Sequence, residues 1–270
     1  MTPELLARYL GILGVQPGLP SIDSLHGLVQ AQVLKIPFEN VSKLYYKETC
    51  HLQDLPALEL YLDGIERFHF GGTCYSNNYH FYQLLDTLGY HIKLCGADMS
   101  DPDVHLVSVV NVEQKEYLVD VGYAAPFLSP LPRDLKQNYT VTLGRDRYVL
   151  RPRDSTGRSQ MELHRDGSLK HGYSVNPAPR QIHEFQKQIE DSYRADSTFM
   201  NTLLLARFFP DRSLVLHNLT VIESQGTVTK SHTLSSRDEL VQAINDYFSI
   251  SGELSEPIVR EMPLSGSAWN

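Results

Sequence analysis

The sequence has few of the features that mark secreted, membrane-spanning or disulfide-rich proteins. Its 270 residues contain three cysteines, an odd and small number that indicates free thiols in a reducing compartment. The N-terminus shows no basic region followed by an apolar core, so no secretory signal is expected. The most apolar run, residues 203–209, is interrupted by Arg207 and is much too short to span a membrane. We therefore predict a cytoplasmic protein.

The charge balance argues against polyanionic macromolecular partners. The formal net charge is −8 and no block of Lys and Arg is present, which disfavours nucleic acid and anionic membrane as partners. The composition, with 41% hydrophobic and 21% charged residues, is that of a folded globular protein. These observations do not argue against a binding site for a small molecule.

The spacing of apolar residues divides the chain into three zones, since no internal repeat or low-complexity tract is present. Residues 1–90 show helical spacing, as in Phe81, Leu84 and Leu85, and predict a helical subdomain. Residues 91–180 show short alternating runs without helices between them, which predicts an antiparallel barrel or sandwich. Residues 181–270 are mixed. The fold class is therefore α+β.

The individual elements follow from the same spacing. Asp166-Gly167 predicts a two-residue hairpin turn. Residues 251–270 predict a tail over the surface, because they contain prolines, glycines and serines. The other predictions are strands at 105–112, 116–121, 139–143, 148–150, 161–164 and 168–175, helices around 182–189, 199–208 and 237–248, and a hairpin-like pair ahead of the last helix.

Cys74 is the cysteine best placed for chemistry. It follows Gly71-Gly72-Thr73 and precedes an amphipathic run, so it lies at or near a helix N-terminus. The partial positive charge and free N–H groups at that end of a helix stabilise a thiolate. A lone buried cysteine is more often a small core residue, and partners are needed to favour the chemical interpretation. Cys50 and Cys95 are interpreted as core or surface thiols.

His105 and Asp120 are the predicted partners. Two strand patterns flank residues 111–114, and a hairpin loop of two or four residues would place His105 and Asp120 on one face, opposite or diagonal to each other. A three-residue loop would place them on opposite faces. Asp120 follows apolar strand residues, where a carboxylate needs a partner such as an imidazole. Cys74, His105 and Asp120 would form a nucleophile, base and orienting acid.

These residues resemble the arylamine N-acetyltransferase family over nearly the whole chain. Residues 36–40, Ile-Pro-Phe-Glu-Asn, and residues 71–74 with Asn78 resemble the first two motifs of that family. His105 and residues 119–123 fall where the family has its catalytic histidine and its D-V-G-F-G segment. Residues 192–199 and 207–212 resemble two motifs of its third domain.

The resemblance implies three subdomains: a helical bundle at 1–90 that carries Cys74, a β-barrel at 91–180 that carries His105 and Asp120, and an α/β lid with a tail at 181–270. It also implies a ping-pong reaction in which Cys74 takes an acetyl group from acetyl-CoA and passes it to an arylamine or hydrazine nitrogen. Acetyl-CoA is then a substrate, and no permanently bound cofactor or metal is expected. The oligomeric state, monomer or dimer, stays open.

The resemblance also assigns the walls of the site. Aromatic rings would stack on a flat amine, and the backbone after Asp120 would contact coenzyme A. Trp269 would lie over the coenzyme cleft if the tail is ordered. The residues expected to bind substrate are Phe38, Tyr75, Tyr123 and Phe199, and those expected to bind coenzyme A are Gly122 and Ala124.

The chain departs from the family pattern at several positions. Phe70 stands where the motif has arginine, and Ser76 where it has Glu or Gln. Glu39 would then be solvated or paired with Lys35 or Lys43. Tyr123-Ala124 replaces Phe-Gly, which predicts a stiffer backbone there.

The acids at 101 and 103 lie on the approach to His105 and would disfavour a polyanionic coenzyme. Two alternatives therefore stay open beside the acetyltransferase. One is an acyltransferase or amide synthase with another acyl donor, and the other is an inactive relative that only binds a ligand. A thiol peptidase is a weaker possibility, because the resemblance extends beyond the triad.

Overall fold

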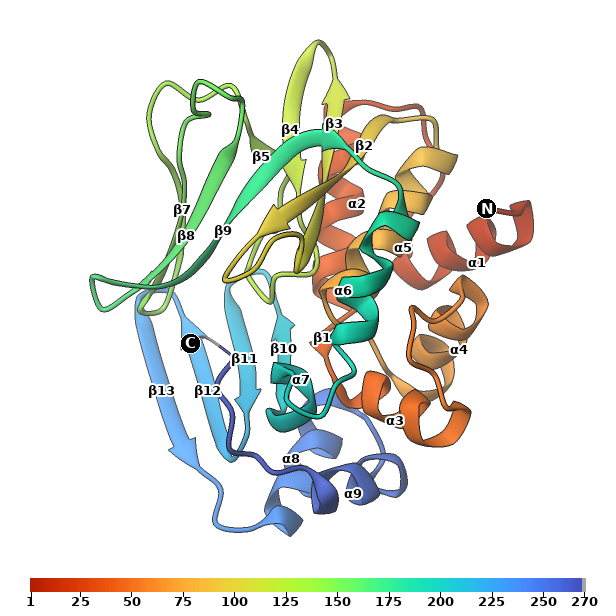
Figure 1. Ribbon diagram of the computed structural model, residues 1–270, viewed down its shortest axis with the longest axis vertical. Coiled ribbons are helices and arrows are strands. Elements are labelled where there is room, and N and C mark those ends of the chain that lie inside the picture. Colours follow the sequence, from red (N-terminus) through yellow and green to blue (C-terminus); the bar gives the residue numbers. More distant parts are fainter. Residues whose placement is uncertain (269–270) are drawn as a thin grey trace.

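The N-terminal part of the chain is a bundle of helices, seen at the right of the computed structural model, which describes residues 1–268 (Figure 1). The predicted helical spacing is confirmed, because Leu25, Phe81 and Leu84 are buried in one core. The helices are α1 (Pro3–Leu13), α2 (Ile22–Lys35), α3 (Val41–Cys50), α4 (Leu58–Phe68) and α5 (Cys74–Thr87).

A chain of buried hydrogen bonds crosses this bundle. Tyr9 donates to Gln32 Oε1 over 3.0 Å, and Gln32 Nε2 donates to the Tyr61 hydroxyl over 3.4 Å. Tyr61 donates to Asn77 Oδ1 over 2.9 Å, and Asn77 Nδ2 donates to the carbonyl of Gly72 over 3.0 Å. Buried polar groups of this kind are satisfied only in one arrangement. The network therefore fixes the chain just before α5.

The middle of the chain forms a nearly closed antiparallel barrel, at the top of Figure 1. Its strands follow the order β5-β4-β3-β2-β9-β8-β7-β6, and no ladder joins the two ends of this sheet in the described chain. The strands are β2 (His91–Asp98), β3 (His105–Val112), β4 (Lys115–Val119), β5 (Leu131–Pro132), β6 (Tyr139–Leu143), β7 (Asp146–Leu150), β8 (Ser159–Arg165) and β9 (Ser168–Pro179).

Two tight hairpins set the register of the barrel. Asp166-Gly167 joins β8 to β9 as predicted, and both residues have positive φ. Glu113-Gln114 joins β3 to β4, and both residues again have positive φ. Two-residue turns with this geometry match the right-handed twist of the strands that they connect. The predicted strands are confirmed, with β3 and β6 at the predicted bounds, and neither β2 nor β5 was predicted.

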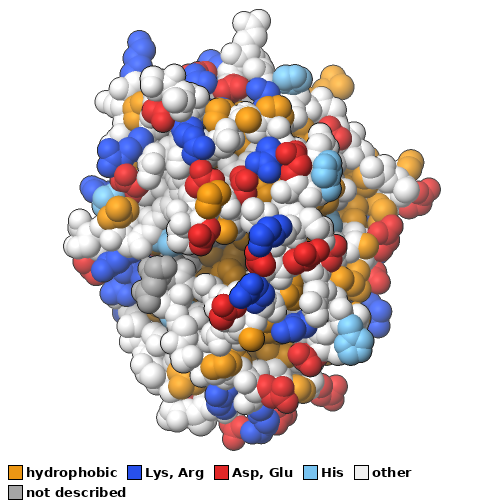
Figure 2. Space-filling view, viewed as in Figure 1, with side chains coloured by type: hydrophobic (Ala, Val, Ile, Leu, Met, Phe, Trp, Pro, Cys, Tyr) orange, Lys and Arg blue, Asp and Glu red, His pale blue; other side chains and the backbone are white. Residues whose placement is uncertain are grey.

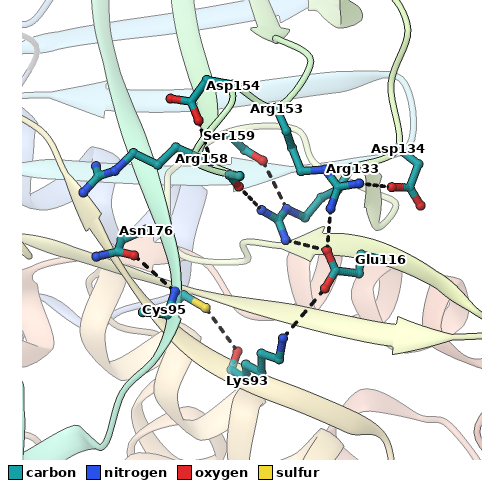
Figure 3. Close-up of polar contacts among 12 residues, drawn as sticks. Lys93, Cys95, Glu116, Arg133, Asp134, Arg153, Asp154, Arg158, Ser159 and Asn176 are labelled. Atoms are coloured by element: carbon teal, nitrogen blue, oxygen red, sulfur yellow. Dashed lines mark hydrogen bonds and ion pairs between the residues drawn. The ribbon is translucent and has the colours of Figure 1, made fainter.

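Arg133 ties together the two sides of the barrel (Figure 3). Its side chain is 1% exposed and donates to Glu116 Oε2 of β4 over 2.9 Å. On the other side it donates to Ser159 Oγ of β8 over 3.1 Å and to the carbonyl of Gly157 over 2.8 Å. Burying a guanidinium is costly unless its donors are satisfied. Arg133 meets this requirement and links β4 to β8, which are not neighbours in the sheet.

The last third of the chain adds a second sheet and the helices that cover it, in the lower half of Figure 1. The strand order is β1-β10-β11-β12-β13, so β1 from the N-terminal part completes the sheet. The strands are β1 (Phe38–Glu39), β10 (Leu204–Phe208), β11 (Arg212–His217), β12 (Thr220–Gln225) and β13 (Val228–Thr233), and the helices are η1 (Ile182–Phe185), α6 (Gln186–Asp191), α7 (Thr198–Asn201), α8 (Arg237–Phe248) and α9 (Gly252–Glu261).

The predicted helix at 199–208 is wrong over most of its length. Only the short α7 is helical there, and Leu204–Phe208 forms the strand β10. Leu205 packs in the core with α8 and α9, whereas Leu204 and Ala206 pack in the core of the helical bundle. A strand buried on both faces is apolar throughout and lacks the alternation that identifies strands. The predicted helix at 237–248 is confirmed as α8.

The predicted surface tail at 251–270 is wrong over residues 252–262. Residues Gly252–Glu261 form α9, and Ile258, Val259 and Met262 are buried in the core beneath the second sheet. Pro257 lies inside this helix, so proline was a poor indicator of irregular structure here. The burial of three apolar side chains outweighs the local preference. Trp269 lies outside the described residues.

The division at residues 90 and 180 stays a prediction. The structure shows how closely the three parts depend on one another, because β1 belongs to the sheet of the last part and α5 packs against β3. Among residues 1–268, the helices are all too short or too polar to cross a membrane.

The Arg133 link generates a stability prediction. Arg133→Ala should lower the free energy of unfolding by about 3 kcal/mol, because Ser159 and Gly157 lose their partner and Glu116 loses a charged one. Chemical denaturation monitored by circular dichroism measures the change. Arg153→Ala is the matched control, since Arg153 also bonds Glu116 but is 36% exposed, and it should cost less than about 1 kcal/mol. Equal losses would show that Arg133 has no special role.

Candidate active site

Cys74 is the first residue of α5, as the sequence predicts. Thr73 is the N-cap of the helix and makes no side-chain capping bond. The first N–H groups of a helix have no hydrogen-bond partner within the helix. At the start of α5 no N-cap side chain covers these groups or the positive end of the helix dipole. Cys74 is partly exposed, Cys50 is exposed and Cys95 is buried. Cys74 thus combines access with a positive local field.

The β3–β4 hairpin brings His105 and Asp120 together. Its two-residue loop pairs Val112 with Lys115, and continuing that register makes Asp120 a diagonal neighbour of His105. His105 Nε2 lies 2.9 Å from Asp120 Oδ2, and both side chains are fully buried. The predicted shared face is therefore confirmed. The sequence left open whether the loop has two, three or four residues, and the structure shows that it has two.

Burial and charge act in opposite directions on this pair. Burial by itself lowers the pKa of His105, but the charge and hydrogen bond of Asp120, together with Cys74, raise it well above its usual value. Burial raises the pKa of Asp120, but His105 and the donor group of Asn78 lower it. Since Nε2 bonds Asp120, Nδ1 is the nitrogen left to exchange a proton with Cys74. This Nδ1 is buried and has no hydrogen-bond partner in residues 1–268.

Asn78 fastens the helix that carries Cys74 to the hairpin that carries the pair. Its Nδ2 donates to Asp120 Oδ1 over 2.9 Å and to the carbonyl of Leu106 over 2.7 Å, and its Oδ1 accepts the Val121 N–H over 2.8 Å. One amide side chain thus satisfies three groups on two strand segments. Asn78 lies four residues after Cys74, on the same face of α5.

Gly122 lets the strand ends approach the nucleophile. A Cβ atom at this position would lie 2.8 Å from the carbonyl oxygen of Cys74 and 2.9 Å from its Cα. No other residue fits without a shift of the helix start. The Gly122 N–H also donates to Asp120 Oδ1 over 3.0 Å. Gly122 was predicted as a coenzyme contact, and the structure shows in addition that it closes the packing around Cys74.

A cavity of about 620 Å³ opens onto the triad. Asp120 lies behind His105 and does not reach the cavity. Figure 2 shows a hollow near the middle of the face, with a hydrophobic floor and a rim of acidic and basic side chains. The cavity is lined by Cys74, His105 and every residue predicted for substrate or coenzyme: Phe38, Tyr75, Gly122, Tyr123, Ala124 and Phe199. The structure thus brings these residues together, and their individual roles stay predictions.

Aromatic rings make up much of the cavity wall. Phe38 and Phe199 contact each other with ring centroids 5.6 Å apart, although 161 positions separate them in the chain. Tyr75 donates to the carbonyl of Asp103 over 2.6 Å, which holds its ring in place. Ala124 has a φ of 57°, in the left-handed region that favours glycine. The stiffer backbone expected after Asp120 stays a prediction.

Tyr173 of β9 was missed by the sequence analysis. Its ring packs 5.0 Å from that of His105, and the charge of Asp120 adds to burial in raising the pKa of its hydroxyl. The ring covers the imidazole on the side of the barrel. Only its place in the alternating pattern of β9 marked it as an inward-facing residue, and that pattern does not distinguish a core position from a site position.

The prediction for Glu39 is wrong. Its carboxylate is fully buried and is neither solvated nor paired with Lys35 or Lys43. It accepts the Ser42 N–H over 2.8 Å and the Gly71 N–H over 2.9 Å. Burial raises its pKa, and these N–H groups oppose the rise. Two backbone donors, one at the start of α3 and one in the segment before α5, therefore bind Glu39 in place of the cation that the resemblance implied.

Phe70 fills the space where the family motif has arginine. It is buried and packs against Tyr45, Tyr46 and Phe68 with ring centroids 5.4 to 5.8 Å apart. Aromatic contacts of this geometry stabilise a core. An apolar cluster therefore replaces the ionic contact at this position.

Lys43 instead joins α3 to the segment after α6. Its Nζ donates to Ser192 Oγ over 2.5 Å and lies 3.9 Å from the centre of the Tyr193 ring. Burial lowers the pKa of Lys43 to about 7, while Cys74 opposes and Lys47 assists this change. No carboxylate pairs with Lys43 in the described chain. It is therefore an amine held by a hydroxyl and a ring beside the site.

The acidic approach to His105 is weaker than predicted. Asp103 Oδ2 pairs with Arg180 over 2.9 Å, so its charge is compensated. Asp101 lines the cavity and has no cationic partner in the described chain. Asp191 and Asp196 also line the cavity but pair with Lys187 and Arg194. The loop before His105 thus presents one uncompensated carboxylate, that of Asp101, to an anionic ligand, and not two.

The comparison with known proteins identifies the family. The model of an N-acetyltransferase family matches residues 21–256. The chain belongs to the arylamine N-acetyltransferase family. It is 29% identical over 230 residues to a chicken (Gallus gallus) arylamine N-acetyltransferase, the pineal gland isozyme NAT-3. The aligned region covers 76% of this chain and 78% of that protein. It is 23% identical to proansamycin X synthase of Amycolatopsis mediterranei, over 81% of this chain and 86% of that one.

Solved structures of the family share the fold. The Nocardia farcinica arylamine N-acetyltransferase has a TM-score of 0.77 at 26% identity, and the match covers 97% of this chain and 94% of that one. The Mycobacterium marinum arylamine N-acetyltransferase in complex with CoA has a TM-score of 0.79 at 22% identity, over 94% and 98% of the two chains. The α+β fold with a nearly closed barrel is therefore that of the family.

The part of the chain that the structure describes contains no group of three or more His, Cys, Asp and Glu side chains that could hold a metal ion. Two histidines outside the triad make hydrogen bonds of other kinds. His164 bonds Glu162 over 2.9 Å, and His80 bonds Gln83 and the carbonyl of Pro56.

The clamp by Asn78 generates a kinetic prediction. Asn78→Ala should slow acyl transfer by about 10- to 100-fold, because Asp120 loses a donor and His105 loses its fixed orientation. Gln32→Ala is the matched control: it removes another buried amide, which bonds Tyr9 and Tyr61 but touches neither the triad nor the segment before Cys74. Both variants should lose about 2 kcal/mol of stability. Similar rates in the two variants, measured well below their melting temperatures, would contradict the assigned role.

The depressed pKa of Lys43 generates a pH prediction. Its folded pKa, about 7, lies below that of the unfolded chain, so the folded state gains stability as pH rises from 7 toward 10.5. The stability of Lys43→Met relative to the native chain should therefore fall by about 2 kcal/mol between pH 7 and pH 9. Urea denaturation of both proteins at the two pH values measures this difference. A constant difference would show that Lys43 keeps its proton throughout.

Proposed function

We propose that the protein is an acetyl-CoA-dependent arylamine N-acetyltransferase. The observation that carries this proposal is the buried His105–Asp120 pair beside Cys74, which lies at an uncapped helix start and opens onto an aromatic cavity. Family membership supports the same activity. Acetyl-CoA serves as a substrate and not as a resident cofactor, since coenzyme A leaves once its acetyl group has passed to Cys74.

In the first half-reaction, His105 takes the proton of the Cys74 thiol. The sulfur attacks the carbonyl carbon of acetyl-CoA, and a new carbon–sulfur bond forms. The N–H groups at the start of α5 stabilise the oxyanion that develops. The bond from the carbonyl carbon to the coenzyme sulfur then breaks, and His105 returns the proton to coenzyme A. The product is an acetyl-thioester on Cys74.

In the second half-reaction, the amine nitrogen attacks the same carbonyl carbon. The carbon–nitrogen bond forms, His105 takes a proton from the nitrogen, and the bond to the Cys74 sulfur breaks. The proton then returns to Cys74 as the thiol. Asp120 holds the imidazole and stabilises its charged form in both steps. No metal takes part in this sequence.

The cavity wall suits the two substrates. Phe38, Tyr75, Tyr123 and Phe199 offer ring faces to a flat arylamine or hydrazine. Gly122 and Ala124 offer backbone to the thioester end of coenzyme A, and a solved member of the family binds CoA. We place the protein in the cytoplasm, on the basis of its free cysteines. It acts on small molecules as a monomer or dimer.

A second candidate function is acyl transfer from a different thioester. Asp101 favours it, because one uncompensated carboxylate on the cavity wall repels a polyanionic coenzyme. The chain is also similar to proansamycin X synthase, which is named as a synthase and not as an arylamine N-acetyltransferase. Intact-mass spectrometry with different acyl donors separates the two candidates.

Intact-mass spectrometry after brief exposure to acetyl-CoA tests the proposal. The native chain should gain one acetyl group and lose it when an aromatic amine or hydrazine is added. Cys74→Ala should gain none, whereas Cys50→Ala should behave like the native chain, since that exposed thiol lies outside the cavity.

The outcomes distinguish the candidates. An adduct only with longer acyl-CoA or with carrier-bound thioesters would keep Cys74 as nucleophile and assign a different donor. No adduct with any thioester would contradict the enzyme assignment and favour an inactive relative that binds a ligand.

A further inference from the structure

A second imidazole lines the cavity. His171 of β9 is half-buried and belongs to the same wall as His105 and Tyr123. The acyl-transfer steps do not use it, and the sequence analysis gave it no role. Its place in the cavity raises the question of what its polar atoms contact.

Tyr123 holds His171 in one orientation. The Tyr123 hydroxyl lies 2.8 Å from His171 Nδ1, and the two rings are nearly parallel with centroids 5.7 Å apart. Tyr123 is itself fixed by Tyr173, at 4.9 Å, and by Phe127, at 6.1 Å. A side chain held from two sides in this way presents its remaining polar atom in a defined direction.

The proton positions follow from the local environment. Burial raises the pKa of Tyr123, and burial together with the charge of His105 lowers the pKa of His171, so both groups are neutral at neutral pH. We assign the Tyr123 hydroxyl as the donor in its bond to Nδ1, because the described chain offers the hydroxyl proton no other acceptor. The single proton of the neutral imidazole then lies on Nε2.

The Nε2–H group is a donor that the described chain leaves without an acceptor. The cavity that His171 lines is partly apolar, because Met99, Leu163, Phe38 and Phe199 line it as well. Pockets of this kind obtain specificity from a small number of fixed polar groups in an apolar wall.

We propose that His171, oriented by Tyr123, is a specificity-determining residue that donates from Nε2 to a carbonyl or carboxylate oxygen carried on the ring of the acceptor amine. This inference rests on the proposed function and names its preferred acceptors: aromatic amines with an oxygen substituent. The hydroxyl that orients His171 belongs to a tyrosine that stands where the family pattern has phenylalanine. The preference therefore belongs to this chain and is separate from the chemistry of the triad.

A matched pair of amines tests the proposal. In 4-aminoacetophenone a carbonyl oxygen stands where 4-isopropylaniline has a methyl group, so the two differ little in shape. His171→Leu should lower the ratio of their kcat/KM values, ketone over alkyl, by about tenfold. Tyr123→Phe should lower it by a smaller factor of about three, because the imidazole stays but its orientation is released. His171→Gln, which keeps an N–H donor, should recover much of the ratio.

Two further measurements separate this proposal from the function on which it rests. Acetyl-enzyme formation from acetyl-CoA should proceed at the native rate in His171→Leu and His171→Gln, because the proposed contact is with the amine. Dissociation constants of the two amines, measured on Cys74→Ala by calorimetry with and without His171→Leu, should show the same change in ratio without turnover.

The contradicting results are specific. Equal losses for both amines, or a loss confined to acetyl-enzyme formation, would overturn the role of His171 and leave the acetyltransferase intact. A native chain that forms no acetyl-enzyme would overturn the proposed function, and the binding ratio would still decide whether His171 recognises the oxygen.

Discussion

The hydrogen bonds that converge on Asp120 are the constraint on which the rest of the site depends. One carboxylate accepts from His105, Asn78 and the Gly122 N–H, and these groups come from β3, α5 and the turn after β4. A buried carboxylate is stable only if all of its partners are present, so the helix and the hairpin cannot separate or slide without a large cost. The position of Cys74 relative to the imidazole follows from this, since Cys74 and Asn78 lie on one face of the same helix.

A second buried carboxylate shows how the same fold tolerates a lost cation. Glu39 has no arginine, yet two backbone N–H groups bind its oxygens and join the start of α3 to the Gly71 segment before the nucleophile. Phe70 uses the vacated space for an aromatic cluster. The connection between the Glu39 region and the nucleophile loop is therefore retained with different chemistry. Departures from a motif at such positions do not by themselves indicate a loss of activity.

The cavity is a product of all three parts of the chain. The bundle supplies Cys74, the barrel supplies His105 and Tyr123, and Phe199 reaches Phe38 from the last part. Asn40 secures this last contact, because its amide donates to the carbonyls of Phe199 and Thr202. The cavity therefore requires the complete fold, and an isolated bundle or barrel would present only part of its wall.

The sequence by itself determined the elements whose signals are local. Turn residues and alternating apolar positions identified the β3–β4 and β8–β9 hairpins. The loop length of the first hairpin, on which the shared face of His105 and Asp120 depends, was left open by the sequence and is two residues in the structure. Tertiary structure decided what depends on contacts distant in sequence: that 204–208 is a strand, that 252–261 is a helix, and that Glu39 is bound by backbone N–H groups. It also decided that His171 bonds Tyr123, 48 positions away. Local patterns report which face of an element is buried, whereas the identity of the partner depends on how the whole chain packs.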